Sequence, residues 1–322
     1  MNNLSAAGFD RLYALGTGYQ ASEIIFTAQR LGIFSLLDAG PVSAKNLGRN
    51  LKLSQDAVCR FMRALKSMGL VAERGGVYRA AAGENCEDVL IHLETLKSSW
   101  QHLGYSLRKG TMQAPGEQTL ADYPRQLRRF LSAMHASGVI KSAAILRAFP
   151  LRRYCRMLDI GGGMGTYAVA FAQENPALQA TVFDLATVVL HAKKYIRQCG
   201  MAGRVSAIAG QCLSDPLPAK DYDLVLLSNI LHIYAAEDAW AIIKKAAKAL
   251  QRGGSLLIHD YIAGCGDQVF VSLFDMTMLV GTPQGRCHAR DDLCRWMKAA
   301  GIGRIRTAPV NAGTSIVWGI RE

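Results

Sequence analysis

The chain has 322 residues, of which 50% are hydrophobic, and it carries a formal net charge of +12 at pH 7. This length and apolar content exclude a disordered or fibrous protein and predict one large domain joined to a smaller one. No long uninterrupted apolar run is present and Met1 to Asp10 lack the layout of a signal peptide, so we expect a cytoplasmic protein without stable membrane insertion.

The first eighty residues have the outline of a winged helix-turn-helix module. Helical spacing begins at about Gln20, and a turn at Gly75-Gly76 separates two short apolar segments. In chain order, the last two helices and the two strands of the wing are predicted at Ser43 to Asn50, Ser54 to Met68, Leu70 to Glu73 and Val77 to Arg79. A winged helix on a chain of this charge could belong to a DNA-binding regulator.

The last helix of this module, Ser54 to Met68, argues against DNA as the partner. A helix that reads a DNA groove is expected to show Asn, Gln or Arg near its start and a broad polar face. This helix starts with Gln55 and Asp56, and apolar residues narrow its polar face. These residues are Phe61, Met62, Leu65 and Met68. A DNA-binding regulator is therefore the less favoured interpretation, and we keep it as an alternative.

Two helical segments and a basic stretch follow the module. We expect helices from Cys86 to Leu107 and from Tyr123 to Ala148, with a loop at Gly110 to Gln118 between them. Seven arginines crowd the stretch before the first strong strand, namely Arg125, Arg128, Arg129, Arg147, Arg152, Arg153 and Arg156. A solvated basic face is the simplest interpretation. An anionic small molecule is the alternative that the charge suggests.

From Tyr154 onward, short apolar strands alternate with helices, which predicts a parallel sheet with helices on both faces. These strands are Met157 to Ile160, Thr181 to Asp184, Val205 to Ala209, Leu224 to Leu227 and Ser255 to Asp260. Only the turn Asn311-Ala312-Gly313 separates the last two strands, Ile305 to Pro309 and Ser315 to Ile320. That spacing predicts a closing antiparallel hairpin.

A glycine-rich loop joins the first of these strands to a helix. The strand ends at Asp159-Ile160, the loop is Gly161-Gly162-Gly163-Met164-Gly165, and the helix runs from Tyr167 to Glu174. Glycines let the backbone turn tightly and let a ligand approach closely. The spacing fits neither a dinucleotide fingerprint nor a Walker loop. Asp184 ends the next strand, where a carboxylate would bind both ribose hydroxyls, so these elements together predict a nucleoside site.

With these motifs the chain resembles the S-adenosylmethionine-dependent O-methyltransferase family, typified by plant caffeate and isoflavone enzymes and bacterial metabolite methyltransferases. The resemblance rests on the winged-helix module, Asp159 to Gly165, Phe183-Asp184-Leu185, Gly210-Gln211-Cys212, Asp223 to Tyr234, Gly253-Gly254 and the last hairpin. It implies an α/β, Rossmann-like class I methyltransferase domain behind a mainly helical winged-helix domain that forms a homodimer. The implied domains are 1–110 for dimerisation, 111–150 as a helical linker contributing to the active site, and 151–322 for cofactor binding.

The resemblance also implies which residues hold S-adenosylmethionine. The glycine loop would face its methionine part, Asp184 its ribose and Leu185 its adenine. Gln211 and Cys212 stand where the family usually has an acid and an apolar residue, and Gln211 could still accept a hydrogen bond from an amino group. The full implied set is Met134, Asp159, Gly161, Gly163, Gly165, Asp184, Leu185, Gln211, Cys212 and Ser228.

His232 matches the family's catalytic base, and Asp260 matches an acid that orients it. A hydroxyl is a poor nucleophile until it is deprotonated, and an unperturbed histidine, with a pKa of about 6.5, can take that proton near neutral pH. His232 follows a strand, at the edge where open α/β sheets bind ligands. The implied acceptor is a small aromatic or conjugated metabolite. Its expected contacts are Asn229, together with Phe274 and Met278 on a predicted helix from Asp267 to Val280.

Departures from the family pattern leave other functions open. Ile233-Tyr234 replaces the Asp-Trp that often follows the histidine, and Cys287 stands where the family has a second acid beside it. His288, or Asp291 and Asp292, could compensate for that acid. A C- or N-methyltransferase that works by proximity is the first alternative, and a cofactor-binding protein that has lost catalysis is another.

A metal-assisted reaction is a further alternative, which would use His232 and His288 as ligands. The carboxylate that would adjoin His232 is replaced by Ile233, and the eight cysteines are scattered without metal-site spacing. We therefore expect no metal.

Overall fold

The computed structural model describes residues 5–81, 87–113, 124–218, 221–311 and 313–322. The chain forms two compact units, Met1–Glu94 and Thr95–Glu322, and each is described by itself. This division falls within helix α6 (Glu87–Trp100), whereas the sequence interpretation placed domain boundaries at residues 110 and 150. Some predicted helix ends and turns lie outside the described residues. They are those at Cys86, at Tyr123, over most of the loop from Gly110 to Gln118, and at Ala312.

The first unit is a small helical module with a three-stranded sheet of order β1-β3-β2. Its elements before α6 are α1 (Ala6–Thr17), α2 (Tyr19–Arg30), α3 (Ile33–Ala39), β1 (Val42–Ser43), α4 (Ala44–Asn50), α5 (Gln55–Ser67), β2 (Val71–Arg74) and β3 (Val77–Ala80). The predicted helices and wing are confirmed, and the sequence interpretation had not included α1. Gly75 and Gly76 form the turn of the wing with φ of 60° and 77°, a conformation that favours glycine.

The second unit is built on a seven-stranded sheet of order β6-β5-β4-β7-β8-β10-β9. The strands are β4 (Arg156–Ile160), β5 (Gln179–Asp184), β6 (Val205–Ala209), β7 (Tyr222–Ser228), β8 (Leu250–Asp260), β9 (Ile302–Pro309) and β10 (Ser315–Arg321). The first five are parallel, and β10 pairs antiparallel with both β8 and β9. The predicted parallel sheet and its closing antiparallel hairpin are therefore confirmed.

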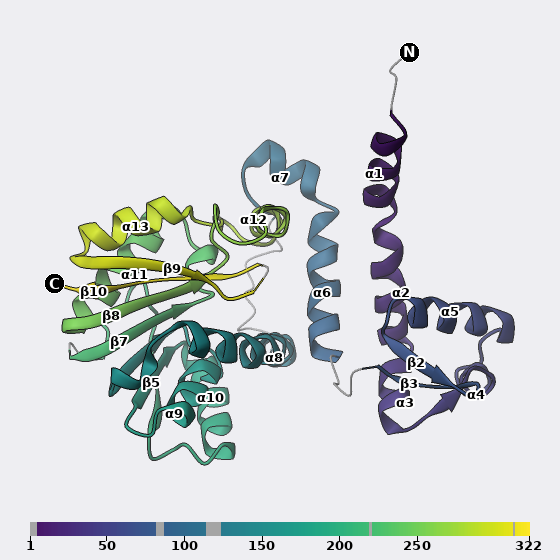
Figure 1. The fold of residues 1–322 in the computed structure, drawn as a ribbon, viewed down its shortest axis with the longest axis horizontal. Coiled ribbons are helices and arrows are strands. Elements are labelled where there is room, and N and C mark those ends of the chain that lie inside the picture. Colours follow the sequence, from purple (N-terminus) through teal and green to yellow (C-terminus); the bar gives the residue numbers. More distant parts are fainter. Residues whose placement is uncertain (1–4, 82–86, 114–123, 219–220, 312) are drawn as a thin grey trace. The chain divides into compact units, whose positions relative to one another are not determined.

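Helices cover both faces of this sheet (Figure 1). The helices of this unit after α6 are α7 (Leu103–Lys109), α8 (Pro124–Ala148), η2 (Leu151–Arg153), α9 (Thr166–Glu174), α10 (Ala186–Gln198), η3 (Leu231–Ile233), α11 (Ala236–Ala249), α12 (Gln268–Gly281) and α13 (Arg290–Ala299). Among the described residues, no helix is both long enough and apolar enough to cross a membrane.

The two largest hydrophobic cores of the second unit lie on opposite faces of the sheet. Successive side chains of a strand point to opposite faces, so Met157 joins one core with Phe171 of α9 while Leu158 joins the other with Ile242 of α11. All four side chains are buried. Strands buried on both faces read as continuous apolar runs, which is why the sequence revealed them so clearly.

The topology sets four strand ends side by side. Ile160 of β4 pairs with Phe183 of β5 and with Leu227 of β7, and Ser228 at the end of β7 pairs with His259 of β8. Because parallel strands end at the same edge of a sheet, the segments that follow these strands form one rim. The residues that the sequence singled out come mainly from this rim.

Candidate active site

The glycine loop turns sharply between β4 and α9. Gly161, Gly163 and Gly165 have φ of 67°, 58° and 79°, a conformation that L side chains rarely adopt. A Cβ on Gly161 would lie 2.1 Å from Cδ1 of Ile230, whereas one on Gly163 would meet no atom within 4 Å. The loop therefore packs closely on its inner side and presents bare backbone at Gly163, where a ligand can approach.

Gly161→Ala is expected to destabilise the protein. The new Cβ would add left-handed backbone strain and a clash with Ile230, so we expect the free energy of unfolding to fall by about 1–3 kcal/mol. Urea unfolding followed by circular dichroism measures this change. Gly203→Ala is the matched control, because a Cβ there meets nothing within 4 Å and no left-handed conformation is required. Equal stability of the two variants would contradict the proposed strain.

Asp184 ties the end of β5 to the glycine loop. Its Oδ2 accepts a hydrogen bond from the Gly163 amide at 2.8 Å, and its Oδ1 accepts one from the Leu185 amide at 2.7 Å. Burial raises the pKa of Asp184, while these two hydrogen bonds oppose that rise. The next residue, Leu185, has 45% of its surface exposed beside this carboxylate. A carboxylate and an exposed apolar side chain thus lie together next to the open part of the loop.

Asp159 is fully buried beneath the same loop, and neither of its carboxylate oxygens has a hydrogen-bond partner in the described part of the chain. Its side chain fills the space under Gly162, since a Cβ on that glycine would lie 2.6 Å from the Asp159 Cγ. Burial, and then the charge of Asp184, raise the pKa of Asp159 to about 7. The carboxyl group is therefore placed to change its protonation near neutral pH.

This raised pKa predicts a pH dependence of stability. A carboxyl group whose pKa is higher in the folded than in the unfolded state stabilises the fold at low pH, and that stability is lost as the pH rises from 3.8 to about 7. The side chain of Asp159→Asn cannot ionise, so this variant should not lose that stability. Its free energy of unfolding relative to the wild type should therefore increase by more than ~1 kcal/mol over this pH window. Urea unfolding at pH 4.5 and 7.5 measures the difference. Asp291→Asn, at a side chain that is 89% exposed, is the control, and parallel pH curves for wild type and Asp159→Asn would contradict the prediction.

Gln211 and Cys212 follow β6 on the same rim. The Gln211 Oε1 already accepts hydrogen bonds from the amides of Leu213 and Ser214, at 2.6 and 2.8 Å. An amide oxygen has two lone pairs, so the acceptor that the sequence interpretation assigned to an adenine amino group is occupied, and the Nε2 group is the donor that remains. Cys212 is buried with its Sγ 3.2 Å from the hydroxyl of Tyr234.

Ser228 and Asn229 end β7 in a buried polar network. The Ser228 hydroxyl lies 2.8 Å from Nδ1 of His259. Asn229 has a left-handed backbone with φ of 52°, and its Nδ2 donates to the Tyr167 hydroxyl at 3.4 Å. The Asn229 Oδ1 is buried and has no partner among the described residues. A buried amide oxygen without a donor is costly, which points to a ligand group that donates to it.

His232 and Asp260 form a buried pair at the next strand end. The Nδ1 of His232 lies 2.5 Å from Oδ1 of Asp260, and the other Asp260 oxygen accepts from the amides of His232 and Leu231. Burial acts to raise the pKa of Asp260, but the interactions with His232, with the Tyr261 amide and with His259 together leave that pKa lowered. No described residue bonds Nε2 of His232. Asp260 thus fixes the orientation of the ring and leaves its second nitrogen available.

Aromatic side chains surround this histidine. Phe274 of α12 meets the His232 ring edge to face at 5.2 Å, and it stacks on Tyr261 with the ring centroids 3.6 Å apart. Met278, one turn further along α12, is buried. The sequence interpretation had proposed Phe274 and Met278 but not Tyr261, although Tyr261 directly follows Asp260 at the end of β8.

The structure gives Cys287 and its neighbours other partners than His232. The Cys287 amide donates to Asp275 of α12 at 2.6 Å. His288 is buried with its Nε2 at 3.0 Å from the Leu231 carbonyl oxygen. Asp291 and Asp292 pair with Arg290 and Arg295 on α13. No group of three or more His, Cys, Asp or Glu residues in the described ranges is placed to hold a metal.

Helix α8 crosses next to the glycine loop. His135 lies 2.8 Å from the Thr166 hydroxyl at the start of α9, and the adjacent Met134 is 38% exposed. About two turns further on, Lys141 is buried with its ammonium 3.1 Å from the Tyr261 hydroxyl. The sequence interpretation missed Lys141, although this lysine falls at helical spacing in the apolar stripe of Leu131, Gly138 and Ile145. By contrast, all seven arginines of the basic stretch are exposed.

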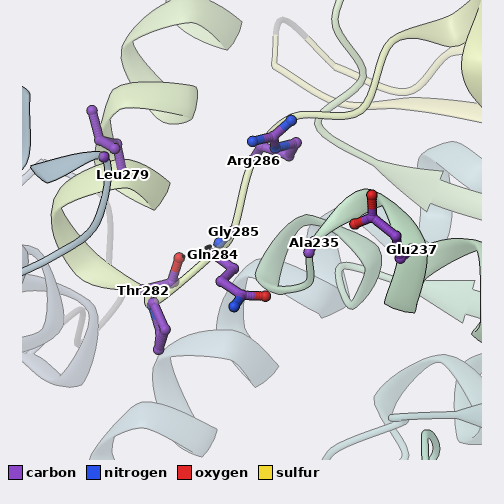
Figure 2. A pocket seen from close by; sticks show the side chains of 9 residues that line it. Ala235, Glu237, Leu279, Thr282, Gln284, Gly285 and Arg286 are labelled. Carbon is purple, nitrogen blue, oxygen red and sulfur yellow. Dashed lines mark hydrogen bonds between the residues drawn. The ribbon is translucent and has the colours of Figure 1, made fainter.

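A cavity of about 330 Å³ opens beside the backbone of the histidine segment. It lies between the start of α11, the end of α12 and the loop after α12, as Figure 2 shows for Ala235, Leu279 and Arg286. The Arg286 amide donates to the His232 carbonyl oxygen at 2.8 Å and thereby holds the segment that carries the ring. None of the predicted site residues lines this cavity.

Comparison with known families gives two matches along the chain. Residues 100–303 match the model of the O-methyltransferase domain, and residues 13–83 match that of the O-methyltransferase dimerisation domain. The dimerisation match includes the helix that had been weighed as a DNA-reading element.

Individual proteins agree with these matches. A 3-hydroxy-5-methyl-1-naphthoate 3-O-methyltransferase of Streptomyces sahachiroi is 27% identical over 91% of this chain and 89% of its own length. The N,N-dimethyltransferase OxyT of Streptomyces rimosus is 26% identical over 77% of each chain. Human N-acetylserotonin methyltransferase, solved with S-adenosylmethionine, superposes with a TM-score of 0.86 at 22% identity, over 100% of this chain and 99% of its own.

Proposed function

The chain belongs to the O-methyltransferase family and is an S-adenosylmethionine-dependent methyltransferase of small metabolites, and from this premise we propose that its acceptor is an aromatic or conjugated compound methylated on a hydroxyl, with His232 as general base. The observation that carries the proposal is the His232–Asp260 pair, in which Nδ1 is held at 2.5 Å and Nε2 faces no described partner. The aromatic rings of Tyr261 and Phe274 beside it offer a flat apolar surface.

The residues of the rim fit S-adenosylmethionine. An ionised carboxylate has about four lone-pair sites, and Asp184 uses two of them on the Gly163 and Leu185 amides. Two sites remain for the two hydroxyls of a ribose. Leu185 offers an exposed apolar surface for adenine, and the bare backbone at Gly163 gives room for the rest of the molecule. When bound, this cofactor supplies a methyl group on a sulfonium that already carries its leaving group.

The chemical work of the protein is then to position and deprotonate the acceptor. Nε2 of His232 takes the hydroxyl proton as the oxygen becomes the nucleophile, and the ionised Asp260 stabilises the imidazolium that results. Phe274 and Tyr261 hold the acceptor ring and exclude water from the reacting oxygen. Positioning of this kind is itself a large part of catalysis, because it converts an encounter between two molecules into a reaction within one complex.

The same observations fit the alternative functions less well. One relative is named as an N,N-dimethyltransferase, which acts on nitrogen. An amine is nucleophilic without prior deprotonation, so its methylation would not require the buried His232–Asp260 pair as a base. A cofactor-binding protein without catalysis would have no use for that pair. We also propose that the first unit mediates a homodimer rather than DNA binding, in line with the dimerisation match over residues 13–83.

The test is a titration followed by an acceptor screen. Calorimetry of the full chain with S-adenosylmethionine and S-adenosylhomocysteine should show binding of both. A screen of phenols, with matched anilines as the nitrogen control, and a methyl-labelled cofactor should then give transfer to the hydroxyl compounds. Transfer to the anilines alone would overturn the oxygen assignment while leaving the methyltransferase in place.

A further inference from the structure

Lys141 is a buried cation beside the proposed acceptor site. Only 8% of its surface is exposed, and it lies on α8, in the stripe of side chains that faces the body of the second unit. Its ammonium donates to the Tyr261 hydroxyl at 3.1 Å and lies 4.9 Å from the centre of that ring. Burying a charged group is costly unless the group is paired, so a lysine in this position calls for an explanation.

The described residues provide no counter-ion for this lysine. The charge of Asp260 acts on Lys141, but this carboxylate is hydrogen-bonded to the His232 ring. All four hydrogen bonds to Asp260 come from other donors, namely the His232 ring and the amides of Leu231, His232 and Tyr261. An ammonium has three donors. One of them reaches Tyr261, and two remain without a described acceptor.

The position of the lysine links it to the reacting centre. Tyr261, which accepts its hydrogen bond, lies 5.8 Å from the His232 ring and stacks on Phe274. A flat acceptor held by these rings would therefore lie beside both His232 and the Lys141–Tyr261 pair. Burial lowers the pKa of Lys141 to about 8, so the side chain still carries its charge at neutral pH.

We propose that Lys141 binds a carboxylate of the acceptor, so that the substrate is an aromatic hydroxy acid. The ammonium supplies the charge and two hydrogen bonds. The Tyr261 hydroxyl, whose oxygen accepts from Lys141, donates its own proton to the same carboxylate. This inference rests on the proposed function, and it assigns to one buried residue the anion preference that the overall charge of the chain only suggested.

The experiment compares two probes with the same hydroxylated ring system, of which only the acid carries a negative charge. Binding of 3-hydroxy-2-naphthoate and of its methyl ester to the full chain is measured by calorimetry in saturating S-adenosylhomocysteine. A hydrogen-bonded charge pair that forms only with the acid predicts a preference of about tenfold or more for it in the wild type. Lys141→Met keeps the length of the side chain and removes its charge, so this variant should lose most of that preference.

Lys194→Met is the matched control, because Lys194 is exposed on α10, and it should keep the preference of the wild type. S-adenosylhomocysteine affinity shows that Lys141→Met is folded. A wild type that does not favour the acid, or a folded Lys141→Met that favours it as strongly as the wild type, overturns the carboxylate assignment alone. Failure of the wild type to bind S-adenosylhomocysteine would instead overturn the proposed function.

Discussion

His232→Ala is expected to lower kcat by about 10²–10⁴-fold, the usual contribution of a positioned general base. The affinity for S-adenosylhomocysteine should change little, because His232 lies with Asp260, Tyr261 and Phe274 rather than with the glycine loop. Steady-state turnover of an acceptor from the hydroxyl screen measures the first quantity, and calorimetry measures the second. Together the two measurements separate loss of the base from loss of the cofactor site.

The control for this prediction is His191→Ala, which removes a histidine from α10 without touching the His232–Asp260 pair. Its kcat should equal that of the wild type. Unchanged turnover in His232→Ala would rule out the base assignment and leave a mechanism in which the protein acts by positioning alone. That outcome would favour an acceptor whose nucleophile is already ionised or is an amine.

Asp184→Ala is expected to weaken binding of S-adenosylmethionine and S-adenosylhomocysteine by about 10²-fold or more. Hydrogen bonds to a charged acceptor contribute about 1.5–3 kcal/mol each, and this variant would lose two to a ribose. It would also leave the Gly163 and Leu185 amides without their acceptor, which loosens the loop at its open point. Calorimetric titration of the purified variant measures the loss directly.

Asp291→Ala serves as the control here, since this aspartate is 89% exposed on α13 and pairs only with Arg290 among the described residues. Both variants lose one negative charge, so a general electrostatic effect would change their affinities alike. Wild-type affinity in a folded Asp184→Ala would place the ribose elsewhere and remove the central assignment of the cofactor site.

Much of the fold could be predicted because its signals are local. The central parallel strands β4, β7 and β8 are buried on both faces over most of their length, so they appear in the sequence as short apolar runs. The edge strand β6 is partly exposed, and it was also predicted with the ends that it has. The loop from Gly161 to Gly165 was visible because left-handed backbone requires glycine at three of its positions. His232 followed one predicted strand and Asp260 ended another, and the ends of strands in a parallel sheet share one rim.

Contacts between distant segments were harder to predict. Gln211 was predicted to offer a free acceptor, but in the turn after β6 its oxygen accepts from two backbone amides. The sequence left open whether His288 compensates for the acid that Cys287 replaces, whereas packing gives Cys287 and His288 the partners Asp275 and the Leu231 carbonyl oxygen. Each of these contacts depends on the position of a turn or of another element in the folded chain, and a local sequence pattern does not specify that position.

The sequence by itself determined the order of the elements, the glycine loop and the strand-end residues, because backbone conformation and burial on a sheet follow from neighbouring residues. Only the tertiary structure decided which side chains meet. It brought Lys141 of α8 to Tyr261, the residue after β8 and 120 positions away, and it paired His232 with an acid 28 positions away. The physical reason is that the charge and hydrogen bonding of a buried group are set by its neighbours in space, which packing of whole elements selects.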